Sequence, residues 1–311
     1  MTPIDIIIPT YKPGKEFLEL VERLCTQTVP VGRILVMNTE EKYYEELVYG
    51  AKITENYREK VSVFHLSRRE FDHGGTRHRG VLRSQAEIFV MMTQDAMPVD
   101  NHLLEHLLRP LEEQKCAVSY ARQLAGDQSS RVEQITRAFN YPEEARIQTA
   151  GQLAEKGVKT FFCSNVCAAY KRKVYDELGG FIRHTIFNED MIYAAGAVKA
   201  GYHIAYAADA KVFHSHDYTN RQQFQRNFDL GVSQADHPEV FAGLSSEKEG
   251  GRLVRTVTKQ LSCPGNWGQL IGFYTQCFCK YAGYFMGKHY KKLPGKVILK
   301  CTMSPAYWKK K

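Results

Sequence analysis

The sequence predicts an α/β fold: an open, mostly parallel β-sheet flanked by helices, followed by a helical, basic carboxyl-terminal extension. Short β-branched and apolar runs that alternate with segments of helical spacing predict the sheet. The charge distribution predicts the extension, because residues 250–311 carry two arginines, ten lysines and no acidic residue, a net charge of +12. Residues 1–249 carry 30 basic and 34 acidic side chains. An anionic partner is therefore expected for the extension alone.

Four apolar runs in the first 95 residues are predicted to be buried strands. They lie at residues 4–9, 33–37, 61–66 and 87–93, and helices are predicted at 16–27 and 76–85. In such sheets a ligand binds at the carboxyl ends of the strands. Thr10, Asn38, the segment 65–77 and Asp95 all fall at those ends.

Further elements are predicted in the rest of the chain. Strands are predicted at 116–121 and 161–170, helices at 101–114, 171–178, 189–198, 218–236 and 267–285, and loop with short helix at 126–157. The run between Gly201 and His216 alternates apolar and polar residues, which is typical of a strand.

Several classes of protein are disfavoured by what the sequence lacks. The turn after the first strand, Thr10 to Gly14, has no glycine-rich dinucleotide motif, and no P-loop lysine motif occurs. The eight cysteines form no Cys-x-x-Cys pair and are expected to be free thiols in a reducing cytoplasm. No apolar run is long enough to span a membrane, and no secretory signal is expected.

Two segments at the predicted strand ends have side chains suited to a phosphorylated ligand. Gly74 and Gly75 would let the backbone approach a ligand closely, and Arg77 suits phosphate. A plain glycine turn with a solvated arginine explains the same residues equally well. Asp95 closes a buried strand, where a lone carboxylate suits Mg²⁺ or Mn²⁺ together with substrate phosphates. A turn-capping aspartate is the alternative.

A pair of carboxylates opens a later helix. Asn188 is predicted to cap that helix, and Glu189 and Asp190 lie in its first turn, where the helix dipole favours negative charge by about 0.3–1 kcal/mol. His214 and His216 follow after the next strand. These residues fit an active site, and they also fit a capped surface helix. A zinc site is disfavoured because no third ligand lies near the two histidines in sequence.

The carboxyl-terminal extension combines aromatic residues with lysines. Seven large apolar residues are predicted to share one stripe of the helix at 267–285: Trp267, Leu270, Ile271, Tyr274, Phe278, Tyr281 and Phe285. Such a helix suits the surface of an anionic membrane. A helix packed on the body of the protein with a frayed basic end is the alternative. Nucleic acid is not expected to bind, because no recognition motif is present.

Taken in order, the motifs of residues 3–220 resemble glycosyltransferase family 2, the inverting nucleotide-sugar transferases with a GT-A fold. The bacterial rhamnosyltransferase-like branch is the most similar. The resemblance rests on the motifs at 6–11, 71–77, 93–98, 178–181, 188–190 and 212–216. It implies a GT-A domain at residues 1–235 and a helical extension at 236–311.

The resemblance also implies roles for individual residues. Asp190 would be the catalytic base and Glu189 its neighbour, and Asp95 and His214 would hold Mg²⁺ or Mn²⁺, with His216 as the next candidate. The donor nucleotide sugar would be bound by six residues: Thr10, Tyr11, Asn38, Arg77, Gln94 and Asp95. The acceptor or sugar would be bound by Asn165. Two positions depart from the family pattern, Thr93 in the place of the first aspartate of Asp-x-Asp and Asn38 in the place of a common aspartate.

The implied reaction needs one carboxylate that removes a proton from the acceptor hydroxyl and positive charge beside the leaving diphosphate. A glycosidase would need two carboxyls flanking the scissile bond. Glu189 and Asp190 are adjacent in a helix and point about 100° apart, which does not suit that arrangement.

The implied function is a metal-dependent, inverting transfer of L-rhamnose from dTDP-rhamnose to a hydroxyl of a lipid-linked cell-surface glycan. A family 2 enzyme with a UDP-hexose donor is one alternative, and a non-catalytic nucleotide-sugar-binding subunit is the other. The expected location is the cytoplasm, at the inner face of the cell membrane, with residues 250–311 on the anionic membrane surface.

Overall fold

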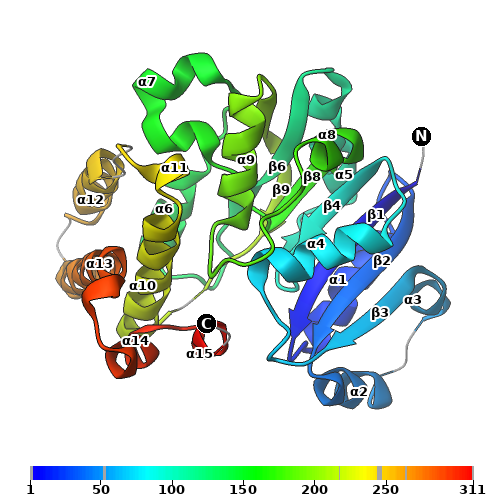
Figure 1. Cartoon of the computed structure of the whole chain (residues 1–311), viewed down its shortest axis with the longest axis horizontal. Coiled ribbons are helices and arrows are strands. Elements are labelled where there is room, and N and C mark those ends of the chain that lie inside the picture. The colour runs from blue at the N-terminus through cyan, green and yellow to red at the C-terminus, as the bar shows by residue number, and fades with distance from the viewer. Residues whose placement is uncertain (1–2, 52–53, 217, 244–246, 263–264, 310–311) are drawn as a thin grey trace. The chain divides into compact units, whose positions relative to one another are not determined.

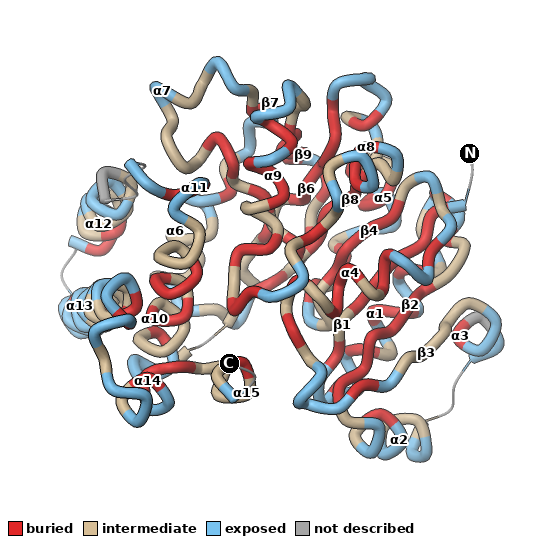
Figure 2. Tube along the Cα trace, in the orientation of Figure 1, coloured by how far each residue is buried: buried red, intermediate tan, exposed pale blue. Residues whose placement is uncertain are grey.

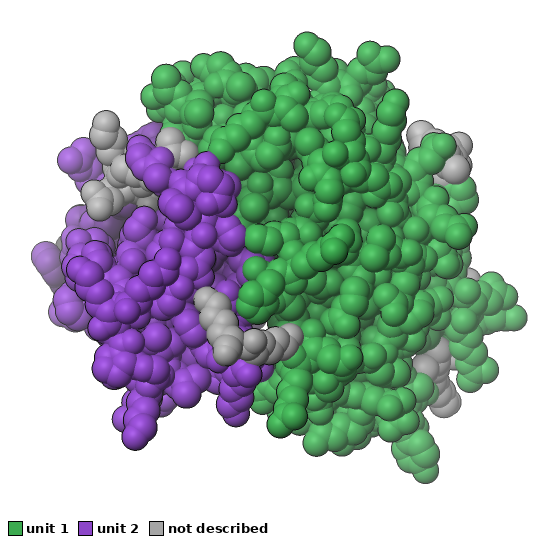
Figure 3. Space-filling model, in the orientation of Figure 1, with its two compact units in different colours: residues 1–124, 141–184, 189–214 green, residues 125–140, 185–188, 215–311 purple. Residues whose placement is uncertain are grey.

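The computed structural model of the chain describes residues 3–51, 54–216, 218–243, 247–262 and 265–309. The chain divides into two compact units (Figure 3). Unit 1 comprises residues 1–124, 141–184 and 189–214, and unit 2 comprises residues 125–140, 185–188 and 215–311. In the part of the chain that is described, no helix is both long and apolar enough to cross a membrane.

Unit 1 is built around one nine-stranded sheet with the order β3-β2-β1-β4-β8-β6-β9-β5, in which β7 also pairs with β9 (Figure 1). The first four strands are parallel, as predicted, whereas β8 runs antiparallel to both β4 and β6. The strands are β1 (Ile4–Tyr11), β2 (Val31–Thr39), β3 (Val61–Leu66), β4 (Ile88–Met92), β5 (Met97–Pro98), β6 (Cys116–Leu124), β7 (Arg146–Gln148), β8 (Cys167–Lys171) and β9 (His203–Phe213).

Helices pack on both faces of this sheet, which is why its strands are apolar on both sides. Ile6 and Ile8 of β1 pack with Phe17 of α1, whereas Ile7 contacts the opposite helix at Gly80 of α4. The sheet is accordingly the most deeply buried part of unit 1 (Figure 2). The α-helices of the unit are α1 (Lys15–Cys25), α2 (Glu41–Tyr49), α3 (Glu55–Lys60), α4 (His73–Arg83), α5 (Leu103–Leu108), α7 (Leu153–Lys156), α8 (Arg172–Glu177) and α9 (Glu189–Lys199). Its 3₁₀ helices are η1 (Arg109–Glu112), η2 (Ala150–Gln152) and η3 (Gly157–Phe161).

Two predicted elements of unit 1 differ from the structure near the candidate site. Helix α4 begins three residues before the predicted start, because the Asp72 side chain accepts a hydrogen bond from the Gly75 N–H at 2.9 Å and caps the helix. The strand predicted at 161–170 is wrong in its first half, since β8 begins only at Cys167. The backbone N–H of Asn165 donates to the Asp190 carboxylate instead of pairing with a strand.

Unit 2 consists of helices. They are α6 (Arg131–Asn140), α10 (Asn220–Asp236), α11 (Pro238–Phe241), α12 (Glu247–Leu261), α13 (Trp267–Lys288), η4 (Tyr290–Lys292), α14 (Gly295–Cys301) and α15 (Pro305–Trp308). Helix α6 lies in the segment that was predicted to be loop and short helix. The start of α10 is fixed by a reciprocal capping box, in which Thr219 and Gln222 each hydrogen-bond the backbone of the other.

Helices α10 and α13 approach each other closely through glycines. A Cβ atom at Gly283 or Gly287 of α13 would clash with the backbone carbonyls of Phe224 and Phe228 in α10. Gly231 of α10 is equally tight against the backbone of α13. This packing places α10 in the same unit as α13. The division into a GT-A domain at residues 1–235 and an extension at 236–311 stays a prediction.

Candidate functional site

Polar side chains at the ends of three neighbouring parallel strands are joined by hydrogen bonds. Thr10, Asn38 and His65 lie beside one another in the registers of β1, β2 and β3. The Thr10 hydroxyl donates to Asn38 Oδ1 at 3.0 Å, and Asn38 Nδ2 lies 2.9 Å from His65 Nδ1. The structure thus brings together two of the residues predicted to bind the donor, Thr10 and Asn38.

Tyr11 and Gln94 form a second pair at the same sheet edge. The Gln94 side chain accepts from the Tyr11 N–H at 2.9 Å and donates to the Tyr11 carbonyl at 3.1 Å. The Tyr11 ring is 38% exposed and meets Tyr43 edge-on, with centroids 5.7 Å apart. The Arg68 guanidinium lies 5.7 Å from the Tyr11 ring centroid. This aromatic and cationic surface can stack a planar ring and attract an anion. Sequence reasoning missed Tyr43, and it included Arg68 only as part of the segment 65–77 without singling it out.

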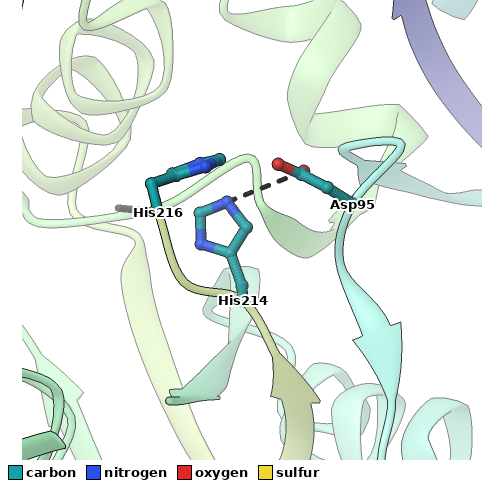
Figure 4. A group of neighbouring side chains, drawn as sticks. All are labelled: Asp95, His214 and His216. Atoms are coloured by element: carbon teal, nitrogen blue, oxygen red, sulfur yellow. Dashed lines mark ion pairs between the residues drawn. The ribbon is translucent and has the colours of Figure 1, made fainter. Parts of the chain in front are cut away.

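A third group contains the residues predicted to hold a metal ion. The Nε2 atom of His214 lies 3.6 Å from an Asp95 carboxylate oxygen (Figure 4). The Nδ1 atom of His214 lies 3.0 Å from Gln123 Oε1, so the nitrogen that faces Asp95 is the one suited to a metal. Among the described residues, one ligand atom each of Asp95, His214 and His216 lie within 4.8 Å of one another. The residue that joins the two histidines is thus Asp95, which is distant from them in sequence and was already predicted to bind the metal.

Glu189 is held in a buried ion pair. Its carboxylate lies 3.2 Å from Arg77 Nη1, and both side chains are at most 9% exposed. The side-chain amide of Asn165 donates to the same carboxylate oxygen of Glu189 at 3.1 Å, and Asn165 in turn accepts from the Tyr170 hydroxyl at 2.6 Å. Arg77, which was predicted to bind the donor, is thus turned towards Glu189.

The glycines before Arg77 serve packing within unit 1. A Cβ atom at Gly74 would clash with the Ile182 carbonyl, and one at Gly75 would lie 2.6 Å from the Arg183 carbonyl oxygen. The first turn of α4 can therefore lie directly against the backbone of residues 182–183. This contact, rather than close approach to a ligand, accounts for the two glycines.

Asp190 occupies a different environment from its neighbour Glu189. Its carboxylate accepts hydrogen bonds from the backbone N–H groups of Asn165, at 2.9 Å, and Met191, at 2.8 Å. The side chain is only half-buried, whereas Glu189 is 5% exposed. Asn188, just before the helix, has a φ of 65°, and its amide donates to Ser233 Oγ at 3.1 Å. This left-handed conformation differs from the extended backbone that an N-cap residue usually adopts.

The two carboxyls consequently differ in proton affinity. Burial would raise the pKa of Glu189, but the cation of Arg77, His73 and the Asn165 amide outweigh burial and hold this pKa below its ordinary value. Burial raises the pKa of Asp190 to about 7, and the negative charge of Glu189 contributes in the same direction. The backbone N–H groups only partly oppose this rise. Near neutral pH, Asp190 can accept and release a proton, while Glu189 stays ionised.

A chain of contacts within unit 1 links His214 and Asp95 to the segment that holds the Glu189 and Asp190 carboxylates. The Gln123 amide, which holds His214, donates to Ser164 Oγ at 2.9 Å, and Asn165 is the next residue. The Thr93 N–H donates to the Val166 carbonyl at 3.1 Å, which places the loop of Asp95 beside the loop of Asn165. The Thr93 hydroxyl, where the family has an aspartate, is buried without a hydrogen-bond partner. Gln123 was missed because nothing in its local sequence marks it.

Comparisons with known proteins agree with these motifs. Residues 5–179 match the family model described as glycosyl transferase family 2. The chain is 34% identical over 309 residues to the O-antigen chain rhamnosyltransferase RfbN of Salmonella typhimurium (strain LT2), covering 98% of this chain and 96% of that protein. It is also 34% identical over 313 residues to the O-antigen chain rhamnosyltransferase WbaN of Salmonella anatum, covering 99% and 96%.

Solved structures show the same fold at low sequence identity. A mannosyltransferase from Pyrobaculum calidifontis, in complex with GDP-Man and Mn²⁺, matches 94% of this chain and 88% of its own, with a TM-score of 0.63 and 14% identity. TarS residues 1–349 of S. aureus, in complex with UDP-GlcNAc, matches 92% of both chains with a TM-score of 0.51 and 13% identity. The GT-A fold expected from the sequence is thereby confirmed.

Proposed function

Because this chain belongs to glycosyl transferase family 2, we propose that it is an inverting glycosyltransferase whose base is Asp190. The observation that carries the proposal is the unequal environment of the two adjacent carboxyls. Glu189 is buried and paired with Arg77, whereas Asp190 is partly exposed and has a pKa near 7. Asp190 is therefore suited to take up a proton, and the charge of Glu189 is suited to set the pKa of Asp190.

In the proposed step, Asp190 removes the proton of the acceptor hydroxyl as its oxygen attacks the anomeric carbon of the donor. The new glycosidic bond forms as the bond from the anomeric carbon to the diphosphate oxygen breaks, on the opposite face of the sugar, so the configuration inverts. The nucleoside diphosphate leaves with the bonding electrons, and Asp190 later gives its proton to water. Arg77 contributes chiefly by balancing the charge of Glu189.

The donor set of Asp95 and His214, with His216 beside them, fits a divalent ion such as Mg²⁺ or Mn²⁺. When bound, such an ion would offset the negative charge of the leaving diphosphate. The hydrogen bond between Gln123 and His214 Nδ1 keeps Nε2 directed towards Asp95. Thr10, Asn38, Tyr11 and Gln94 would hold the nucleoside.

We infer that the donor is dTDP-L-rhamnose and the acceptor a lipid-linked cell-surface glycan at the inner face of the membrane. The support is the 34% identity, over nearly the whole chain, to two proteins named as O-antigen chain rhamnosyltransferases. A panel of nucleotide sugars tests the donor. Turnover is expected with dTDP-rhamnose in Mg²⁺ or Mn²⁺ and is expected to disappear in EDTA.

Two other outcomes of the donor panel would assign a different function to the chain. Turnover with a UDP-hexose alone would establish the alternative donor. Nucleotide binding by calorimetry without turnover of any donor would favour a non-catalytic binding subunit.

The pH dependence of the reaction is expected to follow the Asp190 carboxyl. Below pH about 7, kcat/KM should fall about tenfold per pH unit, because protonated Asp190 cannot act as a base. Glu189→Gln removes a negative neighbour and leaves the Arg77 cation unbalanced. Both effects favour ionised Asp190, so the acid limb should move to lower pH. Rate profiles of the two proteins at saturating metal measure this shift.

Glu19→Gln, on the exposed side of α1, is the matched control and should leave the profile unchanged. Superimposable acid limbs for the wild type and Glu189→Gln would contradict the assignment of the limb to Asp190.

A further inference from the structure

Helix α13 of unit 2 presents a continuous stripe of exposed apolar side chains. Its members recur every three or four residues and are between 46% and 71% exposed: Trp267, Ile271, Tyr274, Phe278, Tyr281 and Phe285. At 100° per residue, all six fall within about 40° of one line along the helix. With a rise of 1.5 Å per residue, the stripe is about 27 Å long.

The stripe is not the face with which α13 packs in unit 2. Gly283 and Gly287 face α10, and Leu270 and Phe273 lie in a core cluster with Val257 of α12. Leu270, which the sequence placed on the stripe, is only 5% exposed. The helix thus packs through its glycine face and one flank, and the aromatic stripe is left on the surface.

Positive charge lies beside the stripe on α12 and follows the stripe along the chain. The Tyr274 hydroxyl lies 2.8 Å from the Thr258 hydroxyl of α12, and the exposed Arg255 lies one turn before Thr258 on the same side of α12. Five exposed lysines follow at and beyond the end of α13: Lys288, Lys291, Lys292, Lys296 and Lys300. No acidic residue occurs after Glu249 to counter these charges.

We propose that the α13 stripe lies in the interfacial layer of an anionic lipid bilayer, with its long axis parallel to the membrane. Tryptophan and tyrosine favour this layer, and neighbouring lysines and arginines pair with lipid phosphates. A second copy of the chain is a poorer occupant, because it would bring two segments of +12 together. The stripe would be the surface through which the chain binds the membrane at which the proposed reaction takes place. Membrane binding rests on the proposed function only for the presence of a lipid-linked acceptor there.

Fluorescence of the full-length protein tests the stripe directly. The chain has two tryptophans, and Trp308→Phe leaves Trp267, on the stripe, as the only one. Its emission is expected to shift to the blue when vesicles of phosphatidylcholine and phosphatidylglycerol are added. Pure phosphatidylcholine should give little shift, and added salt should reverse the shift. An unchanged spectrum with the anionic vesicles would overturn the proposal.

Sedimentation with the same vesicles measures the contribution of individual side chains. The double variant Phe278→Ser, Tyr281→Ser should bind at least about tenfold more weakly, and Lys292→Gln and Lys296→Gln should each weaken binding about fivefold. Leu82→Ser, a change at an apolar residue of unit 1 that is 65% exposed, is the matched control and should bind normally.

Two results would contradict the membrane surface. One is equal binding by the double variant and the wild type. The other is a concentration-dependent dimer that the double variant abolishes, without vesicle binding, which would make a second copy the occupant. Because sedimentation needs no turnover, a protein that fails it but transfers sugar would refute this inference and leave the proposed function intact.

Discussion

Asp190→Asn is expected to reduce sugar transfer by about 10²–10⁴-fold, the usual contribution of a positioned base. The amide cannot take up the proton of the acceptor hydroxyl. It has nearly the same shape, and its single oxygen can still accept one of the two backbone hydrogen bonds from Asn165 and Met191. Nucleotide binding should therefore persist within about twofold, since Thr10, Asn38 and Asp95 are untouched. Initial rates and calorimetry with dTDP and Mn²⁺ measure the two effects separately.

Glu189→Gln is the companion variant, because it changes the neighbouring carboxyl and leaves the proposed base in place. It should retain far more activity than Asp190→Asn at pH about 8, where Asp190 is ionised in either background. Transfer by Asp190→Asn at a rate within about tenfold of wild type would remove Asp190 from the role of base. A loss of activity that was accompanied by a loss of folded structure in circular dichroism would be ascribed to stability instead.

Gly287→Val is expected to destabilise unit 2 by about 3 kcal/mol or more. Even a Cβ atom at this position would clash with the Phe228 carbonyl, and a branched side chain can be accommodated only if α13 moves away from α10. Because both partners are backbone, no side-chain rotation relieves the contact. Urea unfolding followed by circular dichroism measures the change in the free energy of unfolding.

Gly272 provides a control in the same helix. It is exposed, and a Cβ atom there would meet nothing within 4 Å. Gly272→Ala should therefore stabilise the protein by about 0.5–1 kcal/mol, the ordinary gain from replacing glycine inside a helix. If Gly287→Ala stabilised the protein to the same extent as Gly272→Ala, the close approach of α10 and α13 would be refuted.

Much of unit 1 could be predicted because its strands are short, buried and almost wholly apolar. The four parallel strands were found with small shifts at their ends, and their polar carboxyl-terminal residues led to the strand-end site. The first half of the strand at 161–170 could not be predicted, since its apolar residues are equally compatible with a buried loop. The segment is a loop around Asn165 because the Asn165 N–H donates to the Asp190 carboxylate, which lies 25 residues away in sequence.

Contacts between distant segments account for most of what sequence reasoning missed. Gln123 orients His214 across 91 residues, and only the pairing of β6 with β9 brings them together. Helix α13 posed a different difficulty, because aromatic residues and small residues give it two faces that could each have been the packing face. Gly283 and Gly287, one turn apart, were the available signal in the sequence for a close helix–helix contact.

The main-chain hydrogen bonds that hold Asp190 affect which substitutions around it can be tolerated as the sequence diverges. Its carboxylate is positioned by main-chain N–H groups, which every residue except proline supplies, so neutral drift in side chains around it leaves the anchor in place. Glu189 depends instead on the side chains of Asn165 and Arg77. The proposed base is thus robust to mutation of its surroundings, whereas the carboxylate that shifts its pKa depends on side chains that can be replaced. If Asp190 is the base, the pH preference of the reaction can therefore change in a lineage while the base stays in place.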